Sequence, residues 1–319
     1  MSVVSQHVTW KRWTDPQFFD TRAPSSAGAL VRVRGPWLAL AVIEYRSVHK
    51  EYPDGTVAVV DFSLVIPARR TTVFVGSSGC GKTTLLRMIN RMVDPESGTI
   101  LIDGEDVRQT DPVRLRRSIG YVMQNGGLMP HLTVRDNVAT VPVLNGVSRA
   151  QARLRAGELL ELVGLDPDLG SRYPAQLSGG QQQRVGVARA LASDPNILLM
   201  DEPFAAVDPI VRADLQRETM RLQQELDKTV VFVTHDIDEA FLLGDQVVIL
   251  RQGADVAQLG SPSEIIEAPA DDFVRQFVGL DGGRRSLRAK HTPDGTVLVD
   301  EAGRAHARLI EDGADGSTP

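Results

Sequence analysis

One glycine-rich segment constrains the fold more than any other part of the sequence. Residues 76–83 read Gly-Ser-Ser-Gly-Cys-Gly-Lys-Thr, which fits the pattern GxxxxGK[ST]. The apolar run Thr72–Val75 precedes this segment, and a helical pattern, Thr84–Met92, follows it. Glycines let the backbone bend tightly, so that its N–H groups face inward. We therefore expect a strand, a tight loop and a helix that together bind phosphate.

Short apolar strands alternate with helical stretches over most of the chain. Several of the strands are continuously apolar, which is typical of strands covered on both faces. The predicted strands are Val57–Val60, Thr72–Val75, Ile119–Val122, Ile197–Met200, Val230–Val233 and Val247–Leu250. Between them, Val211, Leu215, Leu222 and Leu226 recur at helical spacing. The alternation predicts an α/β fold with a mainly parallel sheet over residues 40–280.

Other segments depart from this rhythm. Residues 125–176 carry few strand signals and predict an inserted helical part, including a helix at Arg149–Val163. Residues 1–39 lack a helix or strand period and are expected to form a poorly ordered extension. Residues 281–319 are expected to form a short tail. That tail begins with a glycine-rich linker at 282–285 and includes two short strands, Thr296–Val299 and Ala305–Ile310.

Charge and composition narrow the range of partners. Lys and Arg number 35 and Asp and Glu 41, so the formal net charge is −6. This balance argues against a broad basic surface for nucleic acid. Cys80 is the only cysteine, so an intramolecular disulfide is excluded. No stretch approaches the roughly 18–20 apolar residues needed to span a bilayer, so a membrane role is expected to come through a partner.

The glycine-rich segment predicts specific contacts to a nucleotide. Lys82 is expected to reach the β- and γ-phosphates, and Thr83 is expected to bind Mg²⁺. Cys80 is either a redox-sensitive thiol, because helix N-termini favour the thiolate, or a small side chain at a tolerant position. The expected nucleotide-binding residues here are Gly76, Ser77, Ser78, Gly79, Cys80, Gly81, Lys82, Thr83 and Thr84.

Two acidic residues follow one of the apolar strands. Ile197–Met200 is followed by Asp201 and Glu202. Beside a phosphate loop of this kind, an aspartate at a strand end holds Mg²⁺. Glu202 is then placed to polarise a water for attack on the γ-phosphate. Acids also occur as simple solvated strand ends, but the glycine-rich segment favours the catalytic interpretation.

A second candidate anion site precedes a helix expected at about residues 181–192. Residues 177–181 read Leu-Ser-Gly-Gly-Gln, in which Ser178 can cap the helix and two glycines expose backbone N–H groups. One nucleotide does not need two such sites. The simplest interpretation is that a second copy of the chain supplies the nucleotide bound here. The residues concerned are Ser178, Gly179, Gly180 and Gln181.

Together and in this order, the motifs resemble those of ATP-binding subunits of ABC transporters over roughly residues 40–280. The matching segments are Walker A at Gly76–Thr83, the Q-loop glutamine Gln124, the signature at Leu177–Gln181, Walker B at Ile197–Asp201 with Glu202, the D-loop at Ala205–Asp208 and the switch histidine His235. The resemblance implies a P-loop NTPase fold of ABC type. An antiparallel β subdomain and an inserted helical subdomain would belong to it.

The resemblance also implies ligands and roles. ATP and Mg²⁺ would bind, with Glu202, His235 and Gln124 as catalytic residues and with Thr83, Gln124 and Asp201 at the metal. Tyr52 matches the aromatic residue that stacks on adenine in this family. Tyr45 is the alternative, less well placed in the sequence.

Partners follow from the same resemblance. Two copies would hold two ATP molecules head to tail, each between Walker A of one copy and the signature of the other. The helical insert with Gln124 would contact membrane permease subunits, and a substrate-binding protein would act indirectly. The chain would then lie peripherally at the cytoplasmic face of the cell membrane.

Narrower resemblances indicate the transported compound. Residues 86–92, 120–131 and 137–142 are similar to those of importer ATPases for glycine betaine, choline, carnitine and related osmoprotectants. Importers of polar amino acids or polyamines, a soluble ABC ATPase without a permease, and a nonhydrolytic nucleotide-gated scaffold are the alternatives. Osmoprotectant ATPases often end in CBS domains, for which residues 281–319 are too few. Arg70-Thr71 replaces the usual Gly-Glu, so an altered turn before an intact site is expected.

Overall fold

The computed structural model describes residues 41–124, 126–205, 209–226, 228–280, 288–292, 295–299 and 305–308. The extension expected at residues 1–39 lies outside these ranges. The predicted linker at 282–285 and residues 206–208 of the segment matched to the D-loop also lie outside them. In the described part of the chain, no helix combines the length and apolar character needed to cross a membrane.

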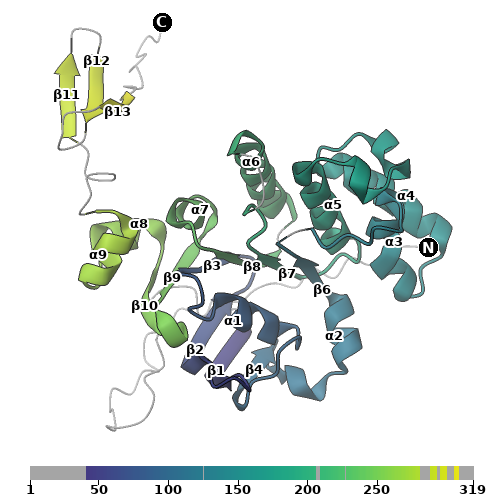
Figure 1. Ribbon diagram of the computed structural model, residues 1–319, viewed down its shortest axis with the longest axis horizontal. Helices are drawn as coiled ribbons and strands as arrows, with labels where there is room; N and C mark the ends of the chain where they lie inside the picture. The colour runs from purple at the N-terminus through teal and green to yellow at the C-terminus, as the bar shows by residue number, and fades with distance from the viewer. Residues whose placement is uncertain are drawn as a thin grey trace, which may run out of the picture.

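A six-stranded sheet forms the centre of the described chain (Figure 1). Its strands are β3 (Thr71–Gly76), β6 (Ile119–Val122), β7 (Ile197–Asp201), β8 (Thr229–Thr234), β9 (Gln246–Leu250) and β10 (Val256–Gly260). The order is β10-β9-β3-β8-β7-β6, and only β10 runs antiparallel to its neighbour. All residues of β3, β7, β8 and β9 are buried, as expected for strands covered on both faces. The predicted α/β fold with a mainly parallel sheet is confirmed.

The two faces of this sheet belong to two different cores. The helices involved are α1 (Lys82–Ile89), α5 (Gly179–Leu191), α6 (Pro209–Leu226) and α7 (Ile237–Leu243). In β3, Val73 and Val75 pack on the side of α5 and α7, whereas Phe74 packs on the side of α1. Figure 1 shows α5, α6 and α7 above the sheet and α1 below it. Because side chains alternate along a strand, β3 holds both layers together.

A second, antiparallel sheet encloses α1 from below. It consists of β1 (Ala41–Glu51), β2 (Val57–Pro67), β4 (Ser97–Ile102) and β5 (Glu105–Asp106), in the order β2-β1-β4-β5. Its Phe62 ring meets Phe74 of the central sheet edge to face, with 6.1 Å between ring centroids. The expected antiparallel part is thus present. Val57–Val60 is a strand as predicted, but it lies in β2, where Val57 and Val60 are exposed.

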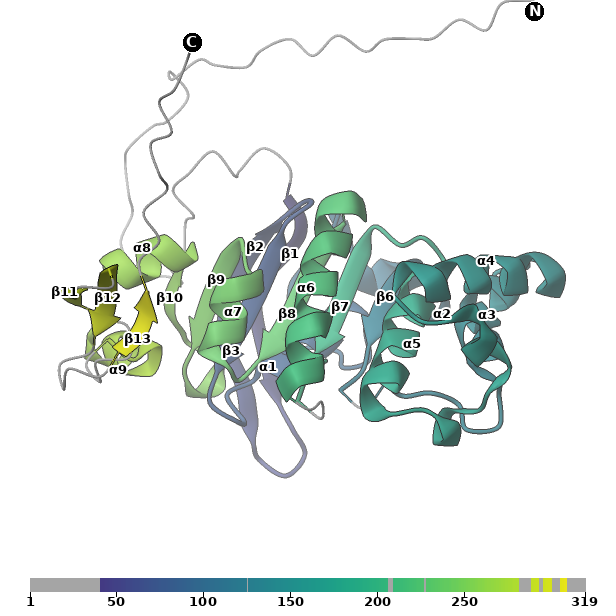
Figure 2. The ribbon, with the colours of Figure 1, turned by 90° about the horizontal axis from the view of Figure 1, so that it is seen from above.

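Helices lie together beside the sheet in the region of the predicted insert. They are α3 (Val134–Leu144), α4 (Arg149–Leu162), η3 (Pro167–Ser171) and η4 (Pro174–Gln176). The hydroxyl groups of Thr133 and Ser148 accept backbone N–H bonds at the starts of α3 and α4, which is the usual role of these residues at helix N-caps. Figure 2 shows α3 and α4 next to α5 at one end of the molecule. That residues 125–176 form a separate inserted subdomain stays a prediction.

The remaining elements connect and follow the two sheets. They are η2 (Val107–Gln109), α2 (Pro112–Ser118), η5 (Gln252–Ala254), α8 (Pro262–Glu267), α9 (Asp272–Val278), β11 (Arg288–Thr292), β12 (Gly295–Val299) and β13 (Ala305–Arg308). The last three strands form a small sheet in the order β11-β12-β13. Strands β12 and β13 match the two that were predicted in the tail, whereas β11 was missed.

The helix after the glycine-rich loop is shorter than predicted. It was expected to reach Met92, but α1 ends at Ile89 and Asn90 is its C-cap. Arg91 has a φ of 57°, a left-handed conformation that commonly ends helices. The apolar periodicity of residues 84–92 therefore continues past the point where the backbone leaves the helix.

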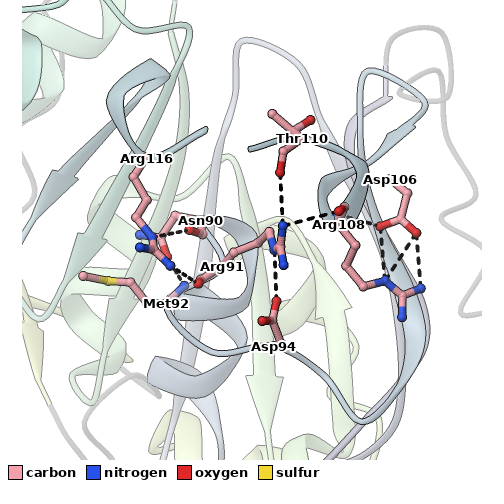
Figure 3. A network of polar contacts seen from close by, with 8 residues as sticks. All are labelled: Asn90, Arg91, Met92, Asp94, Asp106, Arg108, Thr110 and Arg116. Atoms are coloured by element: carbon pink, nitrogen blue, oxygen red, sulfur yellow. Dashed lines mark hydrogen bonds and ion pairs between the residues drawn. The ribbon is translucent and has the colours of Figure 1, made fainter. Parts of the chain in front are cut away.

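Arginines close this end of α1 (Figure 3). Arg116 of α2 donates to the carbonyl oxygens of Asn90 (3.3 Å) and Arg91 (2.5 Å). Arg91 in turn donates to the carbonyl of Thr110 at 3.1 Å and to the carboxylate of Asp94 at 3.0 Å. Helix C-termini leave carbonyl groups unpaired, and positive charge is favourable there. The helix that begins at the glycine-rich loop is thus anchored to α2 at its other end.

Candidate functional site

The glycine-rich loop leads from the end of β3 into α1. A Cβ atom on Gly76 would lie 2.4 Å from the Leu250 carbonyl oxygen, and one on Gly81 would lie 2.3 Å from the Ala58 carbonyl oxygen. Gly81 also has a φ of 107°, which side chains disfavour. Only glycine fits at these two positions. The loop therefore approaches its surroundings closely and leads into the N-terminus of α1, an arrangement suited to binding an anion.

Lys82 is folded back onto the same loop. Its side chain is almost fully buried, and Nζ donates to the carbonyl oxygens of Gly76 (2.9 Å) and Ser77 (2.8 Å). The Lys82 ammonium group is thus held within the glycine-rich loop. Cys80 is completely buried in the core that contains α1. This burial favours the interpretation of Cys80 as a small packing side chain over that of a redox-sensitive thiol.

Asp201, at the end of β7, binds three side chains from two other elements. Its Oδ1 accepts a hydrogen bond from the Thr83 hydroxyl at 2.9 Å. Its Oδ2 accepts bonds from Arg87 Nη2 at 3.2 Å and from the Tyr121 hydroxyl at 3.1 Å. The structure thus brings the predicted pair Thr83 and Asp201 together. Arg87 of α1 and Tyr121 of β6 bind the other oxygen of the same carboxylate.

Arg87 and Tyr121 were not predicted as site residues. Arg87 lies four residues after Thr83, so both are on one face of α1, and that spacing is a signal that the sequence contains. Tyr121 lies in β6, beside the strand that carries Asp201, and no motif marks it. Burial, together with the nearby Asp201 carboxylate, raises the pKa of Tyr121 to about 12. The hydroxyl therefore stays protonated and remains a donor at neutral pH.

The three predicted catalytic side chains converge on one carboxylate oxygen. Glu202 Oε2 lies 3.2 Å from His235 Nδ1 and 3.4 Å from Gln124 Nε2. These side chains follow the ends of β7, β8 and β6, which lie at one edge of the parallel sheet. Glu202 has a φ of 45°, an uncommon conformation for a residue with a side chain. Such strain is typical of functional positions, and here it accompanies a carboxylate shared by two polar partners.

The two tyrosine candidates for adenine stacking lie in different environments. Tyr45 is fully buried, with its hydroxyl bound to the Leu85 carbonyl at 2.9 Å, so neither ring face is open. Tyr52 is partly buried near the start of α1, and its hydroxyl lies 3.1 Å from the Thr84 hydroxyl. Lys50 Nζ lies 5.5 Å from the centroid of the Tyr52 ring. Of the two, only Tyr52 is partly exposed.

The signature segment lies away from these residues. Ser178 and Gln181 form a capping box, in which Ser178 Oγ accepts the Gln181 N–H at 3.3 Å and Gln181 Oε1 accepts the Ser178 N–H at 2.9 Å. Ser178 and Gly179 are exposed. In Figure 1, α5 lies on the far side of the central sheet from α1. Gly180 is buried, and the N–H of Gln181 is already bound by Ser178. The exposed part of this helix start, Ser178 and Gly179, therefore lies on the other side of the central sheet from the helix that follows the glycine-rich loop of its own chain.

Arg189 connects the signature helix to the loop that follows Gln124. Its guanidinium donates to the carbonyl oxygens of Gly126 (2.7 Å) and Gly127 (2.6 Å). A Cβ atom on Gly186, one turn earlier in α5, would lie 3.3 Å from the Gly126 oxygen. This contact was also missed, because its acceptors are backbone atoms and no side-chain motif records them.

Comparisons with known proteins identify a matching family and similar chains. The family described as "ABC transporter" matches residues 59–205. The chain is 50% identical over 238 residues to the choline transport ATP-binding protein OpuBA of Bacillus subtilis, covering 75% of this chain and 62% of that protein. It is 49% identical over 258 residues to the carnitine transport ATP-binding protein OpuCA of Listeria monocytogenes, covering 81% and 64%. The chain thus spans less than two thirds of the length of these two relatives.

A third relative is covered more completely. The chain is 50% identical over 270 residues to the glycine betaine uptake system ATP-binding protein YehX of Escherichia coli, covering 82% of this chain and 87% of that protein. Among solved structures, the dimeric post-hydrolysis state of the ATP-binding cassette MJ0796 bound to ADP and Pi has a TM-score of 0.63 and 34% identity. That match covers 69% of this chain and 98% of the other. At this identity and coverage, the two chains share a fold.

Proposed function

The chain belongs to the ATP-binding subunits of ABC transporters, and from this premise we propose that it hydrolyses ATP to drive the import of an osmoprotectant. Its fold is the P-loop NTPase fold of that family. Glycine betaine, choline and carnitine are the compounds that the names of the relatives carry. One of these quaternary amines is therefore the proposed cargo.

The observation that carries the hydrolytic part is the convergence of Gln124 and His235 on Glu202. A carboxylate at the carboxyl edge of the sheet, oriented by two polar side chains, is suited to accept a proton from an attacking water. Gln124 Nε2 and His235 are then placed to orient that water and contact the γ-phosphate. Tyr52 stacks on adenine, and the loop at 76–84 with Lys82 holds the phosphates.

Thr83 and Asp201 are the proposed holders of Mg²⁺, with Gln124 as a further ligand. A hydroxyl, a carboxylate and an amide oxygen form the hard donor set that this ion prefers, and the first two already lie 2.9 Å apart. When bound, Mg²⁺ neutralises charge on the β- and γ-phosphates. The hydrogen bonds from Arg87 and Tyr121 keep the Asp201 carboxylate facing this position.

The exposed signature supports a composite site formed by two copies of the chain. Ser178, Gly179, Gly180 and Gln181 would bind the ATP held by the loop of a second copy, since α5 lies across the central sheet from α1 and the loop of its own chain. The solved relative MJ0796 is described as dimeric, which agrees with this assembly. The pair would act with membrane permease subunits and, indirectly, a substrate-binding protein, at the cytoplasmic face of the membrane.

Replacing the proposed base tests hydrolysis directly. Glu202→Gln keeps the shape of the side chain and its contact with His235, but removes the proton acceptor. We expect kcat to fall by at least about 100-fold, with ATP binding retained and an ATP-bound dimer visible by size-exclusion chromatography. Glu158→Gln, on the exposed face of α4, is the matched control. Turnover by Glu202→Gln close to that of the wild type would contradict the assignment.

The cargo requires a separate measurement. The chain, purified together with its native membrane partners, is reconstituted into vesicles containing ATP, and uptake of labelled glycine betaine, choline and carnitine is compared with that of a polar amino acid and a polyamine. ATP-dependent uptake of a quaternary amine supports the proposal. Uptake of only the amino acid or the polyamine, or purification without any membrane protein, would refute it.

A further inference from the structure

A buried carboxylate lies next to the proposed hydrolytic residues and has no role in the mechanism above. Glu239 is in α7, four residues after His235, and is only 8% exposed. Its Oε2 accepts a hydrogen bond from the Thr234 hydroxyl at 2.7 Å, and its Oε1 accepts one from Gln216 Nε2 of α6 at 3.1 Å. Arg212 Nε, also from α6, lies 4.0 Å from Oε1. Glu239 therefore joins α6, the end of β8 and α7.

The Thr234 hydroxyl fixes the backbone on both sides of His235. Besides donating to Glu239, it accepts the backbone N–H of Asp236 at 3.0 Å. The Asp236 carboxylate then caps α7 by accepting the N–H of Asp238 at 2.8 Å. His235 thus lies between two residues that are held by side-chain hydrogen bonds, while its own side chain remains 60% exposed. The freedom left to His235 is mainly rotation of its side chain.

A carboxylate in this position is costly for folding alone. Burial raises the pKa of the Glu239 carboxyl, which means that the charged form is disfavoured where it lies. An apolar side chain of similar volume would avoid that cost, and buried charged groups often add nothing to stability. Glu239 nonetheless binds Thr234, the residue before His235. A role in orienting His235 explains this buried glutamate better than a role in stability does.

We propose that Glu239 is a positioning residue for His235: through the Thr234 hydroxyl it sets the orientation in which His235 meets Glu202 and the γ-phosphate. The inference rests on the proposed ATP hydrolysis. Through Gln216 the same carboxylate also ties this orientation to α6. A change in α6 would then reach His235 by way of two hydrogen bonds.

The test uses variants that remove one partner of the Thr234–Glu239 hydrogen bond at a time in the full-length protein. Glu239→Ala removes both acceptors. Thr234→Val keeps the side-chain shape but removes the donor to Glu239 and the acceptor of the Asp236 N–H. Each is expected to lower kcat by about 10- to 100-fold, because small misplacements of catalytic groups cost that much. KM for ATP and the affinity for fluorescent ATP are expected to stay within about twofold of the wild-type values, because the substitutions do not change how ATP itself is bound. Thr234→Ser, which keeps the hydroxyl, is expected to restore most of the activity.

Coupling between the two residues distinguishes positioning from general damage. If both act through one hydrogen bond, the double variant Thr234→Val/Glu239→Ala should lose little more than either single variant. Thr219→Val is the control, because it removes a threonine hydroxyl of α6 whose bond, among the described residues, is to the Leu215 carbonyl one helix turn earlier. It should leave kcat unchanged.

Several outcomes would overturn the inference. Wild-type kcat in Glu239→Ala and Thr234→Val would do so, as would losses that multiply in the double variant. A matching drop in ATP affinity and melting temperature, without rescue by Thr234→Ser, would show a merely structural role. The proposed function fails separately: in that case the wild-type protein itself does not hydrolyse ATP, or Glu202→Gln has no effect.

Discussion

The carboxyl ends of the central strands and the start of α5 differ in how many of their proposed contacts form within a single chain. At the sheet edge, Glu202, His235 and Gln124 meet at one oxygen, and Asp201 meets Thr83. The start of α5 has an ordered capping box, yet its Ser178 and Gly179 are exposed and lie across the sheet from α1. Under the proposed two-copy site, the difference teaches that a motif can be fully formed within one chain and still depend on a second copy for its ligand.

The largest expected effect comes from adding charge at the exposed helix start. Ser178→Asp keeps a good N-cap but places a carboxylate where the phosphates of the second copy would lie. We expect ATP hydrolysis to fall by about 100-fold, as when a preorganised anion-binding donor is lost. ATP binding to the loop of the same chain should be unchanged. Ser148→Asp, at the equivalent cap of α4, is the matched control and should hydrolyse ATP normally.

A mixture of two inactive variants tests directly whether the start of α5 acts on the loop of a second copy. Lys82→Ala damages the loop of one copy, and Ser178→Asp damages the signature of the other. Co-purified heterodimers contain one intact composite site, so a measurable part of the activity should return. If the mixed dimers remained as inactive as either variant alone, the signature would have to act within its own chain.

Tyr121→Phe is expected to have a smaller effect, confined to the sheet edge. It removes one of the three hydrogen bonds to Asp201 without changing the ring. Because outer partners of a metal ligand typically affect metal affinity by 10–100-fold, we expect the Mg²⁺ concentration for half-maximal ATP binding to rise about tenfold. A Mg²⁺ titration with fluorescent ATP measures this. Tyr173→Phe, exposed before η4, should not shift the curve, and an unshifted Tyr121→Phe curve would count against the role of the hydroxyl.

The smallest effect is expected between the two regions, on the loop from α5 to β7. Lys228 lies 2.8 Å from the Asp194 carboxylate and holds its pKa below the ordinary value. Asp194 has a φ of 50°, which asparagine also tolerates. Asp194→Asn should therefore cost only about 0.5 kcal/mol at pH 7 and leave ATP hydrolysis unchanged.

The sign of the pH dependence checks this assignment. A carboxyl whose pKa is lowered by folding stabilises the protein above its unfolded pKa, about 3.9, and loses that contribution as pH falls through the folded value. Denaturant unfolding of wild type and Asp194→Asn should therefore differ at pH 7 and converge in acid. A difference that grows in acid would exclude the ion pair as its cause.

The sequence predicted those parts of the site whose signal is contiguous. Gly76–Thr83 and Asp201-Glu202 follow apolar strands, so the local pattern alone indicates where they lie. Gln124 and His235 could be assigned only through family resemblance, because one polar residue after a strand is not informative by itself. The assignment of all these site residues stays a prediction until variants are measured.

What the sequence did not reveal depends on partners distant along the chain. Arg189 binds backbone carbonyls 62 and 63 residues away. Tyr121 reaches Asp201 only because β6 and β7 are neighbours in the sheet. The strand β11, Arg-Ala-Lys-His-Thr, has few of the β-branched and aromatic residues that mark strands, and pairing with β12 defines it instead.

The burial of Cys80 has a practical consequence. The only thiol of the protein belongs to the glycine-rich loop itself and is fully buried, with its sulfur 3.8 Å from Lys82 Nζ. A maleimide can react with a sulfur buried this completely only when the surrounding structure opens. The rate at which maleimide labels the wild-type protein is therefore expected to report opening of the structure around the loop. A nucleotide bound at the loop should lower that rate.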